Sequence, residues 1–167
     1  MHDELTRVDI EKMKEELDHR IRVLRPQLIE EVKTARAFGD LSENFEYKAA
    51  KRDKNRNDSR IRYLENMIKT AVVIDAASES DAVGLFDRVT FYIEEDGEEE
   101  TIQLVTTLRQ DALKGLISKE SPVARALMGH KVGDRVEIVV SPEMKYTVEI
   151  RAIEQGEDDA SLAISSF

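Results

Sequence analysis

The feature that most constrains this chain is a pair of long apolar stripes with helical spacing in its first half. In residues 10–35, apolar side chains recur every three or four positions, which is typical of one face of a helix. In residues 47–71, steps of three and four alternate as in a heptad seam. A short stretch containing Gly39 separates the two stripes. Residues 1–76 therefore predict an antiparallel helical hairpin, that is, a short coiled coil.

Local signals refine this hairpin. Pro26 interrupts the first stripe and predicts a kink or break, with a second helical segment opening at the proline. Gly39 is suited to the position that ends the first helix. Asp40, with Glu43 three residues later, resembles a capping box, so the second helix is expected over residues 43–74.

Two polar residues, Lys54 and Asn57, lie within the heptad seam of the second helix. Polar groups at seam positions weaken a coiled coil, but they can fix its register. These two residues are therefore expected to set how the two helices align.

The second half differs in both charge and pattern. Residues 1–76 hold 16 basic and 16 acidic residues, whereas residues 77–167 hold 9 and 19, so the second half carries the whole net charge of −10. A domain boundary is expected near residues 75–80, where β-branched residues give way to a small polar stretch. The chain thus predicts two domains, residues 1–76 and residues 77–167.

Four runs rich in β-branched residues predict strands in the second domain, at residues 88–93, 101–106, 135–140 and 146–151. Ser121 followed by Pro122 predicts the start of a short helix over residues 121–128. The fold class is therefore α+β: a helical hairpin followed by an antiparallel sheet with one short helix. The tail from residue 156 could fray or add an edge strand.

Composition excludes several classes of site. The chain has no Cys, so disulfides and Cys-ligated metal sites are excluded, and its three His residues lie far apart. No run approaches the roughly 20 apolar residues that a membrane helix needs, and the acidic N-terminus does not resemble a secretory signal. A cytoplasmic protein without membrane contact is expected.

Acidic residues gather between the two predicted helices. Asp40, Glu43 and Glu46 fall within seven residues, and residues three apart on a helix lie on one side of it. Asp40 and Glu43 could thus approach one hard divalent cation, or they could simply cap the helix. Two carboxylates make an incomplete Mg²⁺ site, because Mg²⁺ requires octahedral geometry, so a partner would have to supply the remaining ligands.

A cationic stretch follows. Residues 48–62 contain seven basic and two acidic residues, with Arg36 just before the acidic group. The stretch is either a solvated helix face or a local phosphate-binding patch on an otherwise acidic protein. The basic residues nearest the acidic group are the candidates for phosphate contact: Arg36, Lys48, Lys51 and Arg52.

At this point the sequence resembles a known family, the bacterial Gre-type transcript cleavage factors. The run Gly39-Asp40-Leu41-Ser42-Glu43-Asn44 resembles the family's hairpin tip, and the run from Ser121-Pro122 to Ala126-Leu127 resembles part of its C-terminal domain. The resemblance extends over nearly the whole chain. Some positions depart from it: Asp9 replaces a usual Gly, Phe45 replaces a usual small residue beside the tip, and Thr106-Thr107 and Met144 replace residues that are often Val-Gly and Gly.

The resemblance implies a function. Family members insert the hairpin into the secondary channel of bacterial RNA polymerase, while an FKBP-like C-terminal domain docks at the channel rim. Asp40 and Glu43 would be the catalytic and metal-binding residues, sharing Mg²⁺ with the polymerase active site to promote cleavage of backtracked nascent RNA. Glu120, Ser121 and Pro122 would lie at the docking surface. The RNA-contacting residues would be the cations nearest the tip: Arg36, Lys48, Lys51 and Arg52. The chain would act as a monomeric accessory factor and not as an enzyme.

Three alternatives remain. A channel-binding inhibitor would share the fold, although the retention of both Asp40 and Glu43 argues against it. A prolyl isomerase would need an aromatic-lined pocket, and the second half has no Trp and five other aromatic residues. A coiled-coil adaptor would bind some other protein.

Overall fold

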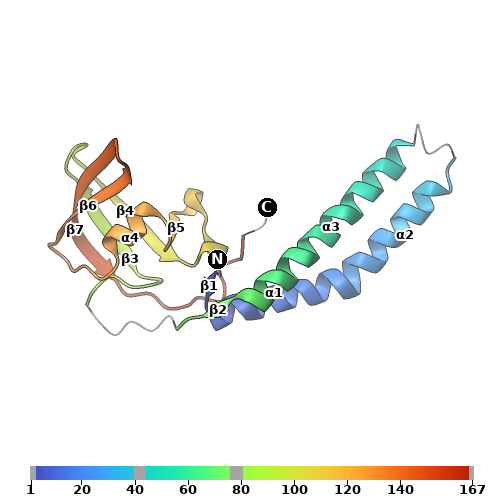
Figure 1. The fold of residues 1–167 in the computed structure, drawn as a ribbon, viewed down its shortest axis with the longest axis horizontal. Coiled ribbons are helices and arrows are strands. Elements are labelled where there is room, and N and C mark those ends of the chain that lie inside the picture. The colour runs from blue at the N-terminus through green and yellow to red at the C-terminus, as the bar shows by residue number, and fades with distance from the viewer. Residues whose placement is uncertain (1–2, 40–43, 76–80, 166–167) are drawn as a thin grey trace. The chain divides into compact units, whose positions relative to one another are not determined.

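The structure is a computed structural model that describes residues 3–39, 44–75 and 81–165 (Figure 1). The chain divides into two compact units. The first spans Met1–Asp3 and Ile10–Ala71, and the second spans Glu4–Asp9 and Val72–Phe167. The division predicted at residue 76 assigns residues 4–9 to the hairpin, whereas the structure packs these residues with the second unit.

The first unit contains the helical hairpin (Figure 1). Helix α1 (Arg7–His19) continues through one π-helical turn (Arg20–Leu24) into α2 (Arg25–Arg36), and α3 (Phe45–Thr70) returns alongside α2. The predicted irregularity before Pro26 is confirmed. Pro26 lies in the first turn of α2, directly after the π-helical turn, and the Arg25 N–H bonds to the Arg20 carbonyl five residues back.

A pair of hydrogen bonds between Asn57 and Arg20 fixes the register of the two helices in the hairpin. Asn57 is only 3% exposed, and its amide oxygen accepts a hydrogen bond from Arg20 Nη1 at 2.9 Å. Asn57 Nδ2 donates in return to the Arg20 carbonyl at 3.3 Å. The register role predicted for Asn57 therefore has a structural basis. Lys54 does not share it, because its ammonium pairs with Asp58 one turn along the same helix at 3.0 Å.

A second polar link joins α1 to α3. Glu16 accepts hydrogen bonds from Arg60 Nε at 2.7 Å and from Arg20 Nε at 2.8 Å. Burial alone would raise the pKa of Glu16, but the hydrogen bonds from Arg60 and Arg20 outweigh it and lower that pKa. Arg60 is thus part of the hairpin's internal packing.

Helix α3 ends earlier than the predicted residue 74. It stops at Thr70, and the next residues form the two-residue strand β2 (Val72–Val73). This strand pairs in parallel with β1 (Glu4–Leu5). The β-branched valines favour this extended pairing over another helical turn.

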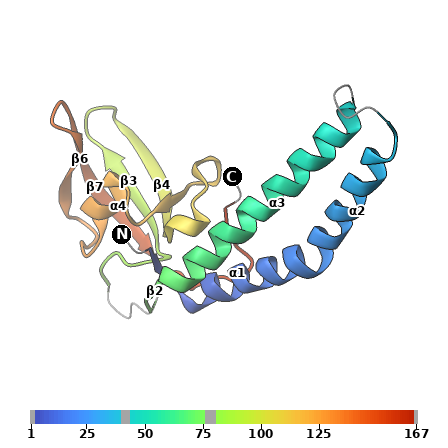
Figure 2. The same cartoon turned by 45° about the vertical axis from the view of Figure 1, so that its right-hand side comes forward.

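The second unit is built on a five-stranded sheet with the strand order β5-β4-β3-β7-β6 (Figure 2; β5 is labelled in Figure 1). The four predicted strands are confirmed, with longer bounds for three of them: β3 (Arg88–Ile93), β4 (Glu98–Val105), β6 (Arg135–Ser141) and β7 (Met144–Glu154). The sequence did not predict β5 (Leu116–Ser118), which pairs in parallel with β4 although all other pairs in this sheet are antiparallel.

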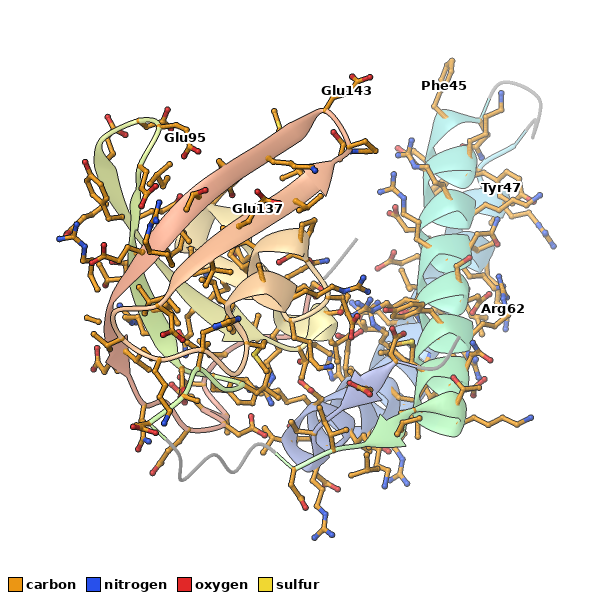
Figure 3. The ribbon with its side chains drawn as sticks, turned by 60° about the vertical axis from the view of Figure 1, so that its left-hand side comes forward. Phe45, Tyr47, Arg62, Glu95, Glu137 and Glu143 are labelled. Atoms are coloured by element: carbon orange, nitrogen blue, oxygen red, sulfur yellow. The ribbon has the colours of Figure 1, made fainter. Side chains whose placement is uncertain are left out.

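One short helix, α4 (Pro122–Leu127), covers the core of this unit, as predicted. Ala124 and Leu127 are fully buried against the sheet, in a cluster with Val89, Phe91 and Ile150. Acidic side chains point outward elsewhere on the unit, among them the labelled Glu95, Glu137 and Glu143 (Figure 3). The sheet domain therefore combines an apolar interior with an acidic exterior.

The segment after β7 lies along the second unit. The Gly156 N–H donates to Asp87 Oδ1 at 3.0 Å, and a side chain at Gly156 would overlap the backbone carbonyl of Phe86. Further on, the Ser165 hydroxyl donates to the Leu108 carbonyl at 2.6 Å. The tail, which the sequence left open, therefore packs on this unit and forms no edge strand in its described part.

The second unit also holds a buried charge cluster. The guanidinium of Arg109 is fully buried and lies 2.5 Å from Asp9 Oδ1 and 2.5 Å from Asp158 Oδ1. It also lies over the Phe86 ring, 5.1 Å from the centroid. Asp9 and Thr6 form a capping box, in which the Thr6 N–H donates to Asp9 Oδ2 at 3.0 Å and the Asp9 N–H to Thr6 Oγ1 at 3.3 Å. The cluster thus joins residues near the start of the chain to the tail.

Candidate nucleic-acid interface at the hairpin tip

The hairpin tip, defined here as residues 36–52, begins with the last residue of α2. The predicted catalytic and metal-binding residues, Asp40 and Glu43, lie in it but fall outside the described residues. Gly39 precedes them with a φ of +128°, a conformation that L side chains rarely adopt. It lies two residues after the helix cap Ala37, one position beyond the predicted place.

The start of α3 differs from the prediction that Asp40 caps it. The N-cap is Asn44, whose Oδ1 accepts the Tyr47 N–H at 3.0 Å. Asn44 Nδ2 also donates to the Ala35 carbonyl at 2.6 Å, which ties the start of α3 to the end of α2. The predicted capping role of Asp40 is therefore wrong, and Asn44 performs it.

The four cations predicted for RNA contact are all exposed in the structure: Arg36, Lys48, Lys51 and Arg52. Arg36 lies over the Tyr47 ring, 5.4 Å from its centroid, and its Nη2 donates to the Tyr47 hydroxyl at 3.3 Å. That hydrogen bond lowers the pKa of the Tyr47 hydroxyl. Tyr47, expected from the stripe to be a core residue, is half-buried and serves as a partner for Arg36.

Other cations of the stretch differ in their contacts: some bond acidic residues of the hairpin, and others are exposed. Arg60 is 5% exposed and bonds Glu16, and Lys54 pairs with Asp58. Arg62 is exposed, and its Nη2 donates to the Ser59 hydroxyl at 3.1 Å. Arg60 and Lys54 are therefore engaged within the hairpin, whereas the cations nearest the tip are exposed.

The predicted docking residues lie together at the start of α4. Ser121 caps this helix by accepting the Ala124 N–H at 3.2 Å, and Pro122 is its first residue. The Glu120 carboxylate accepts hydrogen bonds from Arg125 at 2.9 Å and from Lys119 at 3.1 Å. Both bonds, the one from Arg125 first, lower the pKa of Glu120. Glu120 is therefore held in place as an anion on this surface.

The described residues contain no complete donor set for a metal ion. Within the described ranges, no group of three or more His, Asp or Glu residues could hold a metal ion. Asp40 and Glu43 would add two carboxylates, whose hard oxygen atoms suit Mg²⁺ but leave most of its coordination sites to other ligands. Two carboxylates of this kind would suit an ion whose remaining ligands come from another molecule.

The aromatic residues of the second unit do not favour a prolyl isomerase. Phe86 and Phe91 are 0% and 1% exposed, so both belong to the packed interior. Tyr92 is covered by Arg151, whose guanidinium lies 4.6 Å from the ring centroid. These three rings are therefore unavailable to line an open substrate pocket.

Comparison with known proteins identifies the class of this chain. Residues 4–73 match the family model "Transcription elongation factor, N-terminal", and residues 78–155 match "Transcription elongation factor, GreA/GreB, C-term". The chain is thus a transcription elongation factor, an accessory protein of transcription and not itself an enzyme. Among the residues that the structure describes, no helix is long and apolar enough to cross a membrane.

Individual relatives identify the family. The transcription elongation factor GreA of Geobacillus kaustophilus is 44% identical over 150 residues, which is 89% of this chain and 94% of the relative. GreA of Oenococcus oeni is 42% identical over 147 residues, covering 87% and 91%. Among solved structures, that of the transcription factor Gfh1 aligns over 92% of this chain and 97% of its own at 26% identity, with a TM-score of 0.46. The chain belongs to the GreA/GreB family of transcription elongation factors.

Proposed function

We propose that this factor binds bacterial RNA polymerase, inserts the hairpin tip into its secondary channel and stimulates cleavage of backtracked nascent RNA. The observation that carries the proposal is the grouping of exposed cations on both sides of Asp40 and Glu43 at one end of the hairpin. The resemblance of the tip sequence to the family's cleavage factors supports the same role. An adaptor role would leave this combination of charges without a purpose.

The chemistry follows from the charges. Arg36, Lys51 and Arg52 would hold the extruded RNA by its phosphates, which positions the strand without reading its sequence. Asp40 and Glu43 would add oxygen ligands to an ion at the polymerase active site. A two-metal site holds the attacking and the leaving oxygen of a phosphodiester hydrolysis. The chain would thus complete a site whose other ligands the polymerase supplies.

A cleavage assay tests the proposal directly. Purified factor and Mg²⁺ are added to a stalled, backtracked elongation complex, and the length of the RNA is followed over time. Shortened RNA that can be extended again after nucleotide addition is the expected result. A factor that slows nucleotide addition and yields no cleavage would instead be a channel-binding inhibitor of the same fold, and the proposal would be wrong.

Salt dependence tests the role of the cations. Changing Arg36, Lys51 and Arg52 together to Gln should weaken RNA engagement and reduce the slope of log affinity against log salt by about 2, or about 0.7 per lost phosphate contact. The measurement is the factor concentration for half-maximal cleavage at several salt concentrations.

A matched triple variant controls for the loss of charge as such. Lys14, Arg22 and Lys69 are exposed cations of the same helical unit outside the tip, so their change to Gln should leave the salt slope unchanged. Equal slopes for the parent and the tip variant would mean that the tip cations form only a solvated face.

Docking is tested at Glu120. A Glu120→Lys change places a third cation beside Lys119 and Arg125, so it should raise the concentration for half-maximal cleavage about tenfold by altering the charge of the contact surface. The plateau of cleavage should not change, because the tip is unaltered. Glu143→Lys, at the exposed turn between β6 and β7, is the matched control and should change neither quantity (Figure 3). A lowered plateau with an unchanged midpoint would contradict an anchoring role.

A further inference from the structure

Two aromatic rings at the hairpin tip are largely exposed. Phe38 is 72% exposed and Phe45 is 79% exposed. Phe45 is the first residue of α3, and its ring points away from the helix (Figure 3). Single exposed apolar residues are common on protein surfaces, so the surroundings of each ring decide whether it has a role.

The surroundings of the two rings differ in charge. Phe38 lines a groove of about 510 Å³ between α2 and α3 that also contains three carboxylates, those of Glu30, Glu31 and Glu46. Phe45 instead has a cation over its ring, because Lys48 Nζ lies 5.7 Å from the ring centroid. A polyanion would be repelled from the Phe38 groove and attracted to Phe45.

The face of α3 that carries Phe45 continues with cations. Lys48 and Arg52 follow Phe45 at steps of three and four residues, so all three lie on one side of the helix. At 1.5 Å per residue, they span about 10 Å along the helix axis. Within the described ranges, no ion pair involves Lys48 or Arg52, and both are exposed. The face therefore offers one open ring and two positive charges in a row.

The other nearby aromatic residue is already engaged. The Tyr47 ring is half-buried, and Arg36 lies over it and bonds its hydroxyl, so this ring is less open to a further stacking partner than the exposed Phe45 ring. A flat π face combined with negative charge at short intervals is the chemistry of single-stranded nucleic acid. An apolar pocket of a protein would accept the ring but would give no role to the adjacent cations.

We propose that Phe45 stacks on one unpaired base of the extruded RNA, with Lys48 and Arg52 binding the flanking phosphates. This inference rests on the proposed function, since it names what the tip contacts on the RNA. Phe45 is thereby a positioning residue: it holds the strand near Asp40 and Glu43 and takes no part in the hydrolysis.

The test uses elongation complexes backtracked on RNA that carries either normal purines or abasic nucleotides in the extruded segment. On normal RNA, Phe45→Leu should raise the factor concentration for half-maximal cleavage by about 5- to 100-fold, the loss expected for one stacked base. Phe45→Tyr retains the ring and should behave as the parent does. Phe38→Leu, at the acidic groove, is the matched control and should have no effect.

Abasic RNA separates stacking from other contacts. If the ring stacks on a base, the parent and Phe45→Leu should need the same concentration on RNA that lacks the base. A defect of Phe45→Leu that persists on abasic RNA would mean that the ring contacts the polymerase, and the proposal would be overturned. Equal behaviour of Phe45→Leu and the parent on normal RNA would overturn it as well.

A second readout is independent of cleavage. A 2-aminopurine base in the extruded segment should lose fluorescence when the parent factor binds, and should lose less when Phe45→Leu binds at saturation. If the parent stimulates no cleavage but still quenches through Phe45, the proposed function fails and the stacking contact stands. If cleavage occurs and neither the quenching nor the midpoint depends on Phe45, only the stacking contact fails.

Discussion

Replacing Asp40 by Asn and Glu43 by Gln together is expected to lower stimulated RNA cleavage at least about 100-fold, the scale on which removing preorganised charge stabilisation acts. The amides keep the shape of both side chains but remove the negative charge that a divalent ion requires. Because Asn44 caps α3, the start of the helix should survive the change. The measurement is the cleavage rate at saturating factor on a backtracked complex.

Two observations make this result specific. Glu46→Gln removes the same charge from a residue of the same tip that lines the groove beside Phe38, and it should leave the rate unchanged. Competition with the parent factor for polymerase shows whether the double variant still binds. A double variant that binds normally and cleaves at the parental rate would exclude a metal-binding role for Asp40 and Glu43.

Replacing Arg109 by Met is expected to destabilise the second unit by about 3–5 kcal/mol, the typical cost of breaking a buried ion pair by removing one partner. The change leaves the Asp9 and Asp158 carboxylates without the cation that both approach at 2.5 Å. It also removes the charge that lies over the Phe86 ring. Scanning calorimetry should show a large fall in the melting temperature of this unit.

The control for Arg109 is Lys114→Met. The Lys114 side chain is 73% exposed and belongs to the same unit. Its change to Met removes one positive charge, as Arg109→Met does, but leaves no buried carboxylate without a cation. Its melting temperature should stay close to that of the parent. If Arg109→Met melted at the parental temperature, the buried cluster would contribute nothing to stability.

The fold was predictable wherever a periodic pattern of apolar residues continued over a long segment. The stripe of residues 47–71 spans seven turns of helix and indicated α3 without help from the rest of the chain. The strands β3 and β7 were equally clear because each is a run of β-branched and aromatic residues. In contrast, β5 has only three residues. A run this short shows too little alternation of apolar and polar residues to be told from a loop.

The predicted ends of α3 were wrong because contacts with residues outside the helix decide where this helix begins and ends. Asp40 and Asn44 are both good helix caps, and the sequence cannot choose between them. The bond from Asn44 to the Ala35 carbonyl, which lies on the other helix, favours the later start. Likewise, Val72–Val73 leaves the helix because it pairs with Glu4–Leu5 near the start of the chain.

The candidate site was predicted only in part. The four cations chosen for their closeness to the tip are exposed, but the sequence did not show that the fold buries Arg60 of the same cationic stretch against Glu16. The buried cluster around Arg109 was missed, although one signal was present. Thr6 and Asp9 have the spacing of a capping box, and an acidic residue of that kind can also pair with a distant cation.

The cluster around Arg109 has a consequence for the order in which the chain folds as it is synthesised. Domains generally fold as units, N-terminal ones first, as the chain leaves the ribosome. Here Asp9 leaves early, Arg109 follows a hundred residues later, and Asp158 comes after the last strand. The hairpin can form as soon as α3 emerges, whereas Glu4–Asp9 must wait for most of the remaining chain. A chain that ends directly after β7 would thus have a finished hairpin joined to a sheet domain without its tail and without the Asp158 partner of Arg109.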